Sequence, residues 1–248
     1  MFRHWLEKER PLGDVPPAVY AMLIVTLLLQ LYWHGQQQEI APGAQELPRP
    51  MSAEAYVLSS FGEPVTAAKV LNLWLQAFDN QPGISIPLHE LDYEVVTEWL
   101  DTILELDPRG HYPMLAAARV YGSVSDRDRQ RVMMDFIYSR FNEDRNRHWR
   151  WLAHAVITAR HELGDMPLAL KYADALAENA TAEHVPYWAR DMRIIVLEDM
   201  GEIEAAKVLV GALITSGEIT DPHELRFLEN KIRELEQKLT KSRQDVDK

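Results

Sequence analysis

The sequence contains no cysteine among its 248 residues, so it forms no disulfide and holds neither cysteine-ligated zinc nor an iron–sulfur cluster. Thiol catalysis is excluded for the same reason. Glycine is scarce, with 11 residues, and runs of β-branched residues are few beside alanine, leucine, glutamate and arginine. Because those four residue types favour helices, the composition predicts an all-α fold.

Positive charge and catalytic motifs are also lacking. The 26 basic residues face 38 acidic ones, and the net charge of −12 argues against a general nucleic-acid-binding protein. The sequence has no glycine-rich phosphate loop and no G-x-S-x-G turn. His154 and His161 lie seven residues apart on one expected helix and could share a metal, but two solvated or hydrogen-bonded histidines are the favoured interpretation. We therefore expect no enzyme, no cofactor, no metal site and no small-molecule substrate.

One long hydrophobic run stands out near the start of the chain. Residues 15–33 contain no Asp, Glu, Lys or Arg, and a helix of this length spans roughly 28 Å, close to the hydrocarbon core of a bilayer. We predict one transmembrane helix over residues 15–34. A cleaved signal peptide and a buried helix of a soluble core are the alternatives. The residues expected to anchor the helix in lipid are Tyr20, Leu23, Leu27, Leu31 and Trp33.

The charges that flank this run predict its orientation. Arg3, Lys8 and Arg10 precede it, whereas Arg49 is the one basic residue among the twenty that follow Trp33. Under the positive-inside rule, residues 1–14 form a short cytoplasmic N-terminus, and the rest of the chain lies in the periplasm of a bacterium, at its inner membrane. Residues 35–50 are rich in glutamine, glycine and proline, a composition that predicts a flexible tether.

Three similar segments within the chain indicate a repeated helical hairpin. Gly62-Glu63, Gly164-Asp165 and Gly201-Glu202 each follow an apolar residue and precede an alanine-rich amphipathic stretch. Glycine permits the turn out of one helix, and the acid favours the positive end of the next. Gly164 and Gly201 are 37 residues apart, a helix–turn–helix period. The expected helices span residues 52–60, 64–79, 88–106, 112–122, 126–141, 147–163, 166–179, 185–200 and 202–216.

The segment Leu104-Glu105-Leu106-Asp107-Pro108 resembles the end of a tetratricopeptide (TPR) motif. Ala118 and Tyr121 fall where that motif places its small residue and its aromatic. The resemblance implies an αα-hairpin solenoid of TPR type over residues 51–220, preceded by the transmembrane helix. TPR solenoids bind other proteins along an extended groove, so it also implies protein partners.

Residues 221–248 predict a C-terminal helix and a short tail. Leu225, Leu228, Ile232, Leu235 and Leu239 follow one another at spacings of three and four, which places them on one face of the helix. Such a face either caps the last helical pair or forms a coiled coil with a second chain. Capping is the favoured interpretation, because two heptads are short for a coiled coil.

One basic segment interrupts the acidic background. Seven arginines lie between Arg127 and Arg150, with Trp149 and Trp151 beside them. Arginine and tryptophan are enriched at interface hot spots, and arginines also bind the carboxylates of a partner. Local ion pairs, with the tryptophans in the core, are the alternative. The residues predicted to bind a partner are Arg140, Arg145, Arg147, Trp149, Arg150 and Trp151.

Taken together, these features predict a membrane-anchored TPR-like scaffold or assembly factor, or an accessory subunit of a membrane complex. The alternative is a periplasmic holdase-type chaperone that binds exported proteins. A scaffold has one stoichiometric partner, whereas a holdase has many weak ones, so the two are separable by purification from solubilised membranes.

Overall fold

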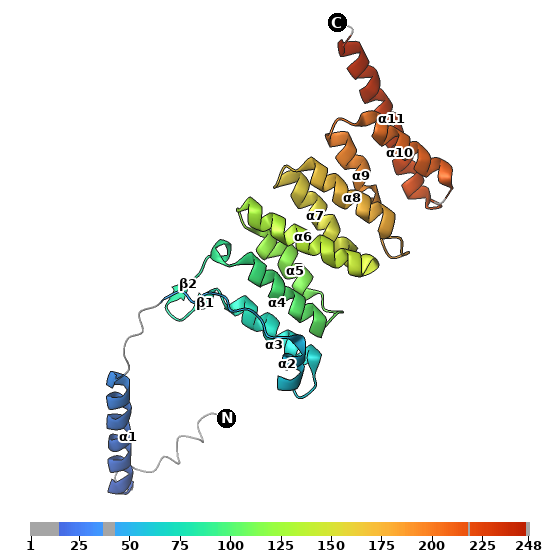
Figure 1. Ribbon diagram of the computed structural model, residues 1–248. Coiled ribbons are helices and arrows are strands. Elements are labelled where there is room, and N and C mark those ends of the chain that lie inside the picture. Colours follow the sequence, from blue (N-terminus) through green and yellow to red (C-terminus); the bar gives the residue numbers. More distant parts are fainter. Residues whose placement is uncertain (1–14, 37–42, 218, 247–248) are drawn as a thin grey trace, which may run out of the picture. The chain divides into compact units, whose positions relative to one another are not determined.

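A computed structural model describes residues 15–36, 43–217 and 219–246 (Figure 1). The predicted cytoplasmic segment 1–14 lies outside the described residues. The chain divides into two units, residues 1–43 and residues 44–248, and we call the second unit the body.

The helix of the first unit, α1 (Pro17–Gln36), lies in the predicted membrane segment. Its stretch Pro17–Gly35 is long and apolar enough to cross a membrane, with a mean hydropathy of 1.4. Tyr20, Leu23 and Leu27 are exposed, and so are Leu31 and Trp33, so the apolar surface of α1 is available to lipid. The Thr26 hydroxyl donates to the backbone carbonyl of Met22 at 2.9 Å, which satisfies this polar group within the helix itself.

The body is built from helices, as the composition predicts. Its one sheet in the described residues is a two-stranded antiparallel hairpin, β1 (Asn80–Gln81) and β2 (Ile84–Ser85). Two 3-10 helices, η3 (Leu88–Glu90) and η4 (Tyr121–Ser123), join longer elements. The α-helices are α2 (Ala53–Ser59), α3 (Pro64–Ala77), α4 (Tyr93–Leu106), α5 (Tyr112–Arg119), α6 (Arg127–Glu143), α7 (Arg145–His161), α8 (Met166–Asn179), α9 (Tyr187–Asp199), α10 (Ile203–Ser216) and α11 (Pro222–Val246).

The three glycines that predicted turns all adopt a positive φ: 86° at Gly62, 64° at Gly164 and 81° at Gly201. Glycine suits this left-handed region because it lacks a Cβ atom. The acid after the glycine behaves as predicted in one turn, where the Asp165 side chain accepts a hydrogen bond from the Leu168 backbone N–H at 3.0 Å. Glu63 and Glu202 make no such capping bond.

Each helix of the body contacts the helix that follows it in the sequence, from α2–α3 to α10–α11. Contacts also join helices one step further apart: α2 to α4, α4 to α6, α5 to α7 and α7 to α9. Figure 1 shows the resulting order, with α2 and α3 at one end of the body and α10 and α11 at the other. Neighbours in the sequence are therefore neighbours in space.

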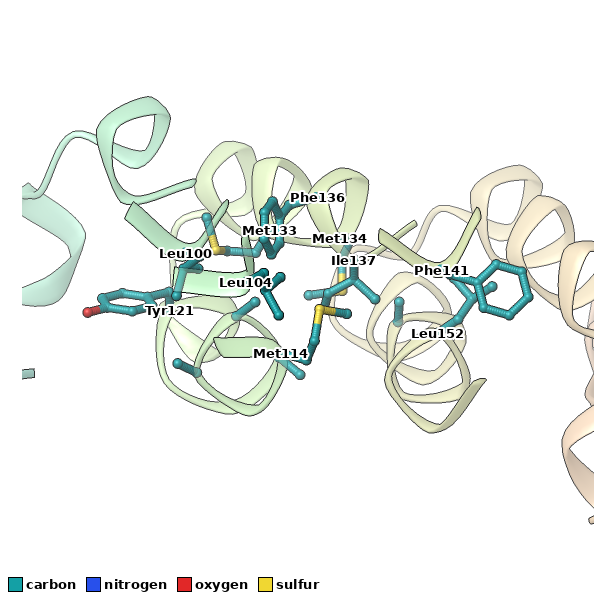
Figure 2. Packing of buried hydrophobic residues seen from close by; sticks show 14 of the residues in the cluster. Leu100, Leu104, Met114, Tyr121, Met133, Met134, Phe136, Ile137, Phe141 and Leu152 are labelled. Atoms are coloured by element: carbon teal, nitrogen blue, oxygen red, sulfur yellow. The ribbon is translucent and has the colours of Figure 1, made fainter. Parts of the chain in front are cut away.

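A continuous apolar core fills the space between these helices (Figure 2). Large side chains from α4, α6 and α7 meet there, and Met114 of α5 and Tyr121 of η4 pack among them. The labelled members of this core are Leu100, Leu104, Met114, Tyr121, Met133, Met134, Phe136, Ile137, Phe141 and Leu152. Alanines such as Ala117 and Ala155 are fully buried between the helices, which lets the backbones approach closely.

The expected helix 112–122 is broken in the structure. α5 ends at Arg119, and residues 121–123 form the 3-10 helix η4. Glycine at position 122 permits the close approach at this break, since a Cβ atom there would lie 2.6 Å from the Ala117 carbonyl oxygen. Tyr121 is buried, and its carbonyl accepts a hydrogen bond from the Tyr93 hydroxyl at 2.9 Å.

The predicted tether over residues 35–50 differs from the structure at both ends. α1 continues to Gln36, and residues 44–50 lie against the body. Leu47 is buried, and Gln45 exchanges two hydrogen bonds with the Gln81 side chain, at 2.8 and 3.0 Å. The Trp99 indole donates to the Pro48 carbonyl at 2.7 Å. Composition alone missed this packing because side chains of α4 and β1, distant in sequence, hold the segment.

The C-terminal helix α11 covers α10 and one face of α9. Leu228 and Leu235 are fully buried in a second apolar cluster with Ile194 and Val210. Lys231 and Lys238 of α11 both form ion pairs with Glu198 of α9. The apolar face of α11 is therefore packed within its own chain.

Candidate protein-binding site

The basic segment lies at a tight junction between α6 and α7. Asp144 is both the C-cap of α6 and the N-cap of α7, so one residue joins the two helices. The sequence predicts a longer connection, a loop over residues 142–146. Its carboxylate accepts a hydrogen bond from the Arg147 backbone N–H at 3.2 Å and so caps α7. This junction brings the last turn of α6 and the first turns of α7 together.

Two of the predicted binding arginines are engaged within the chain. Arg140 forms an ion pair with Asp101 of α4 at 2.9 Å and another with Glu143 at 2.8 Å. Burial raises the pKa of Asp101 to about 6, and the Arg140 charge acts in the opposite direction. Arg147 pairs with Asp144 at 3.1 Å and donates to the Arg109 carbonyl at 3.4 Å. Arg140 thus joins α6 to α4, and Arg147 holds the α6–α7 junction against the loop before α5.

The other two predicted arginines, Arg145 and Arg150, are exposed. Neither forms an ion pair within the described part of the chain. The Arg150 guanidinium carbon lies 5.6 Å from the centre of the Trp149 ring, a cation–π arrangement. Arg145 lies one turn before Trp149 on the same side of α7. Two guanidinium groups therefore remain free to bind carboxylates.

The predicted tryptophans have unequal surroundings. Trp149 is 9% exposed and packs edge-on against Trp188 of α9, with ring centroids 5.5 Å apart. Trp151 is partly buried against the core and belongs to the packing rather than to the surface. Trp188, which the sequence did not single out, is 54% exposed. The repeat spacing could have pointed to Trp188, because it lies 37 residues after Trp151, the same separation as between Gly164 and Gly201.

We call the group formed by Arg145, Trp149, Arg150 and Trp188 the arginine–tryptophan surface. A hollow of about 320 Å³ adjoins it. Trp149 and Arg150 line the hollow together with His111 before α5, Asp144 and Arg147 at the α6–α7 junction, and His184 before α9.

Hydrogen bonds join the parts of the chain that form the wall of this hollow. The His184 ring nitrogen lies 2.7 Å from the Asn146 carbonyl oxygen. The Asn146 side chain in turn accepts a hydrogen bond from the Ala182 backbone N–H at 2.9 Å. These contacts fasten the loop before α9 to the start of α7. The backbone beside the arginine–tryptophan surface is thus held in place before a partner arrives, which lowers the entropy lost on binding.

The two histidines of α7 that could share a metal have different surroundings. His154 lies 3.0 Å from the Ala118 carbonyl oxygen, and burial lowers its pKa, so its neutral ring serves the packing of α7 on α5. His161 is exposed. Among the described residues, no group of three His, Asp or Glu side chains is placed to hold a metal ion.

Comparisons of this chain with protein-family models, with curated proteins and with solved structures found no match.

Proposed function

We propose that this protein is a single-pass, membrane-anchored αα-repeat scaffold of TPR type. In this proposal α1 crosses the bacterial inner membrane, and the body lies in the periplasm as an assembly factor or accessory subunit. The length and apolar surface of α1 support the anchor, and the contacts between successive helices support a stacked αα-hairpin array. Anchoring raises the concentration of the body next to a membrane complex.

The observation that carries the binding role is the arginine–tryptophan surface. It combines two arginines free of in-chain ion pairs with a half-exposed tryptophan, beside a hollow whose wall is hydrogen-bonded. Arginine binds carboxylates with charge-assisted hydrogen bonds, and tryptophan adds a large contact area at little entropic cost. We therefore propose an acidic segment of a protein partner, such as a carboxylate-rich loop or a free C-terminus, as the ligand.

The test is purification of the full-length protein from detergent-solubilised membranes. We expect one stoichiometric partner with the wild type and loss of that partner with R150A/W188A. Hot-spot residues of this kind typically contribute about 2 kcal/mol each, so the association constant should fall by roughly 30-fold for one substitution and by up to about 700-fold for both.

The matched control is R226A/F227A, which removes an exposed arginine and an exposed aromatic from α11. This variant should keep the partner. If both double variants retain it, the arginine–tryptophan surface is not the binding site. Recovery of many substoichiometric proteins, unaffected by either variant, would instead favour the holdase-type chaperone.

A further inference from the structure

The pair α2–α3 exposes an unusual amount of apolar surface. Seven of the fourteen large apolar side chains that are exposed in the described part of the body lie between residues 51 and 74. Leu58 is 82% exposed, Phe61 99%, and Leu73 65%. We call Leu58, Phe61, Val65, Val70 and Leu73 the N-terminal apolar surface.

The backbone at the tip of this pair turns Phe61 outward. Phe61 has a φ of 57°, in the left-handed region that side chains with a Cβ atom rarely adopt. The phenyl ring gains no burial in its own chain to offset this strain. Beside it lies a groove of about 510 Å³ lined by Val57, Leu58 and Leu106. A strained and fully exposed phenylalanine beside an apolar groove points to burial against something outside the body.

The pair α2–α3 is the first helical pair that follows α1 in the chain. Residues 44–50 are held on the body and lead directly into α2. Because α1 crosses the membrane in our proposed function, α2–α3 is the part of the body that follows the membrane most closely along the chain.

The charge of α2–α3 selects among possible occupants. Residues 53–77 carry Lys69 against Glu54 and Glu63, which is 1 − 2 = −1. Such a hairpin has no cationic cluster for anionic headgroups, but its apolar side chains suit the headgroup–acyl boundary of a neutral lipid surface. A second copy of the chain would have to diffuse to this surface. The bilayer, in contrast, is always nearby, because the chain joins the body to α1.

We propose that the N-terminal apolar surface binds the lipid surface of the membrane that α1 crosses, with Phe61 and Leu58 at the boundary between headgroups and acyl chains. This inference rests on the proposed anchor. The body would then lie on the membrane at a defined end, with the arginine–tryptophan surface, four helices further along the chain, left available to a partner.

The absence of cysteine makes a direct test possible, because any cysteine introduced is the only one to label. Full-length single-cysteine variants L27C, F61C and V208C would be labelled with a fluorophore and reconstituted into phosphatidylcholine vesicles that carry nitroxide-labelled lipid. Val208 is the matched control, an apolar side chain of α10 that is 73% exposed. We expect lipid quenching at positions 27 and 61 and none at 208.

A second variant separates docking from proximity. V70E/L73E should abolish the quenching in the F61C background and leave the quenching unchanged in the L27C background. Anionic lipid should not strengthen the quenching, since the hairpin has no excess of positive charge. Quenching at 27 without quenching at 61 overturns the docking and leaves the anchor intact. No quenching at 27 overturns the anchor, and the docking falls with it.

The F61C protein without its label tests whether a second copy of the chain covers this surface instead. Oxidation to a disulfide-linked dimer in the vesicles, with no lipid quenching at 61, would show that a second copy covers this surface and would overturn the proposal.

Discussion

The two ends of the body differ in how they cover their apolar side chains. At the C-terminal end, α11 buries Leu228 and Leu235 against α9 and α10, and its lysines pair with Glu198. At the N-terminal end, α2 and α3 leave Phe61 and Leu73 in contact with water. A stack of helical pairs needs a polar outer face at each end to stay soluble. In the stacked array that we propose, α11 covers one end, whereas the exposed apolar side chains of the other end are left for an outside surface.

Substitutions at the two ends of the body test this comparison. The largest loss of stability is expected from Leu228→Ala. Leu228 is fully buried between α11 and its neighbours, so the substitution removes buried apolar volume and leaves a cavity. We expect the free energy of unfolding of the full chain in detergent to fall by about 2–5 kcal/mol, measured by urea denaturation.

Leu73→Ala is the matched control at the other end, because the same atoms are removed from a side chain that is 65% exposed. Its expected effect is within about 0.5 kcal/mol. Equal losses from the two substitutions would mean that Leu73 is as well covered as Leu228 in the solubilised protein, either by the chain or by the detergent micelle.

An intermediate effect is expected from pH at the junction of α9 and α11. Burial raises the pKa of Asp191 to about 8, and the hydrogen bond and charge of Glu224 on α11 act in the same direction. Arg190 and Arg193 oppose the shift. Since an unfolded aspartate titrates near 4, the folded chain binds the extra proton between about pH 4 and 8. Stability from this group is therefore full below about pH 4 and lost as the pH rises through about 8.

Urea midpoints at pH 5, 7 and 9 check this expectation. The wild type should lose stability across the series, and Asp191→Asn should flatten the decline because the amide does not titrate. A decline of the same size in the variant would assign the pH dependence to other groups.

A small effect of opposite sign is expected from Phe61→Asn. Asparagine tolerates the left-handed conformation better than phenylalanine, and the exposed ring contributes no burial. The full-length protein in detergent should become more stable by about 0.5–1 kcal/mol, read as an increase in the urea midpoint. A loss of stability would show that the Phe61 ring is covered in the solubilised protein, either by the chain itself or by the detergent micelle.

The candidate site could be predicted only in part from the sequence. The cluster of arginines and tryptophans is apparent from the sequence. Which of these side chains form contacts within the chain, and which are exposed, is not. Arg140 is engaged because Asp101, 39 residues earlier, lies on the neighbouring helix α4. Trp188 joins the surface because α9 packs on α7. Which arginine is paired depends on contacts between helices, and periodicity along one helix does not contain that information.

The sequence by itself determined the elements that depend on local physics. A run without charge predicts α1, and glycines that accept a positive φ set the turns at Gly62, Gly164 and Gly201. Tertiary structure decided what long-range contacts control: residues 44–50 lie on the body because Trp99 and Gln81 bind them, α5 breaks where Gly122 meets Ala117, and the apolar face of α11 is occupied. Helix formation follows from neighbours a few residues apart, whereas burial and pairing depend on residues that only the folded chain brings together.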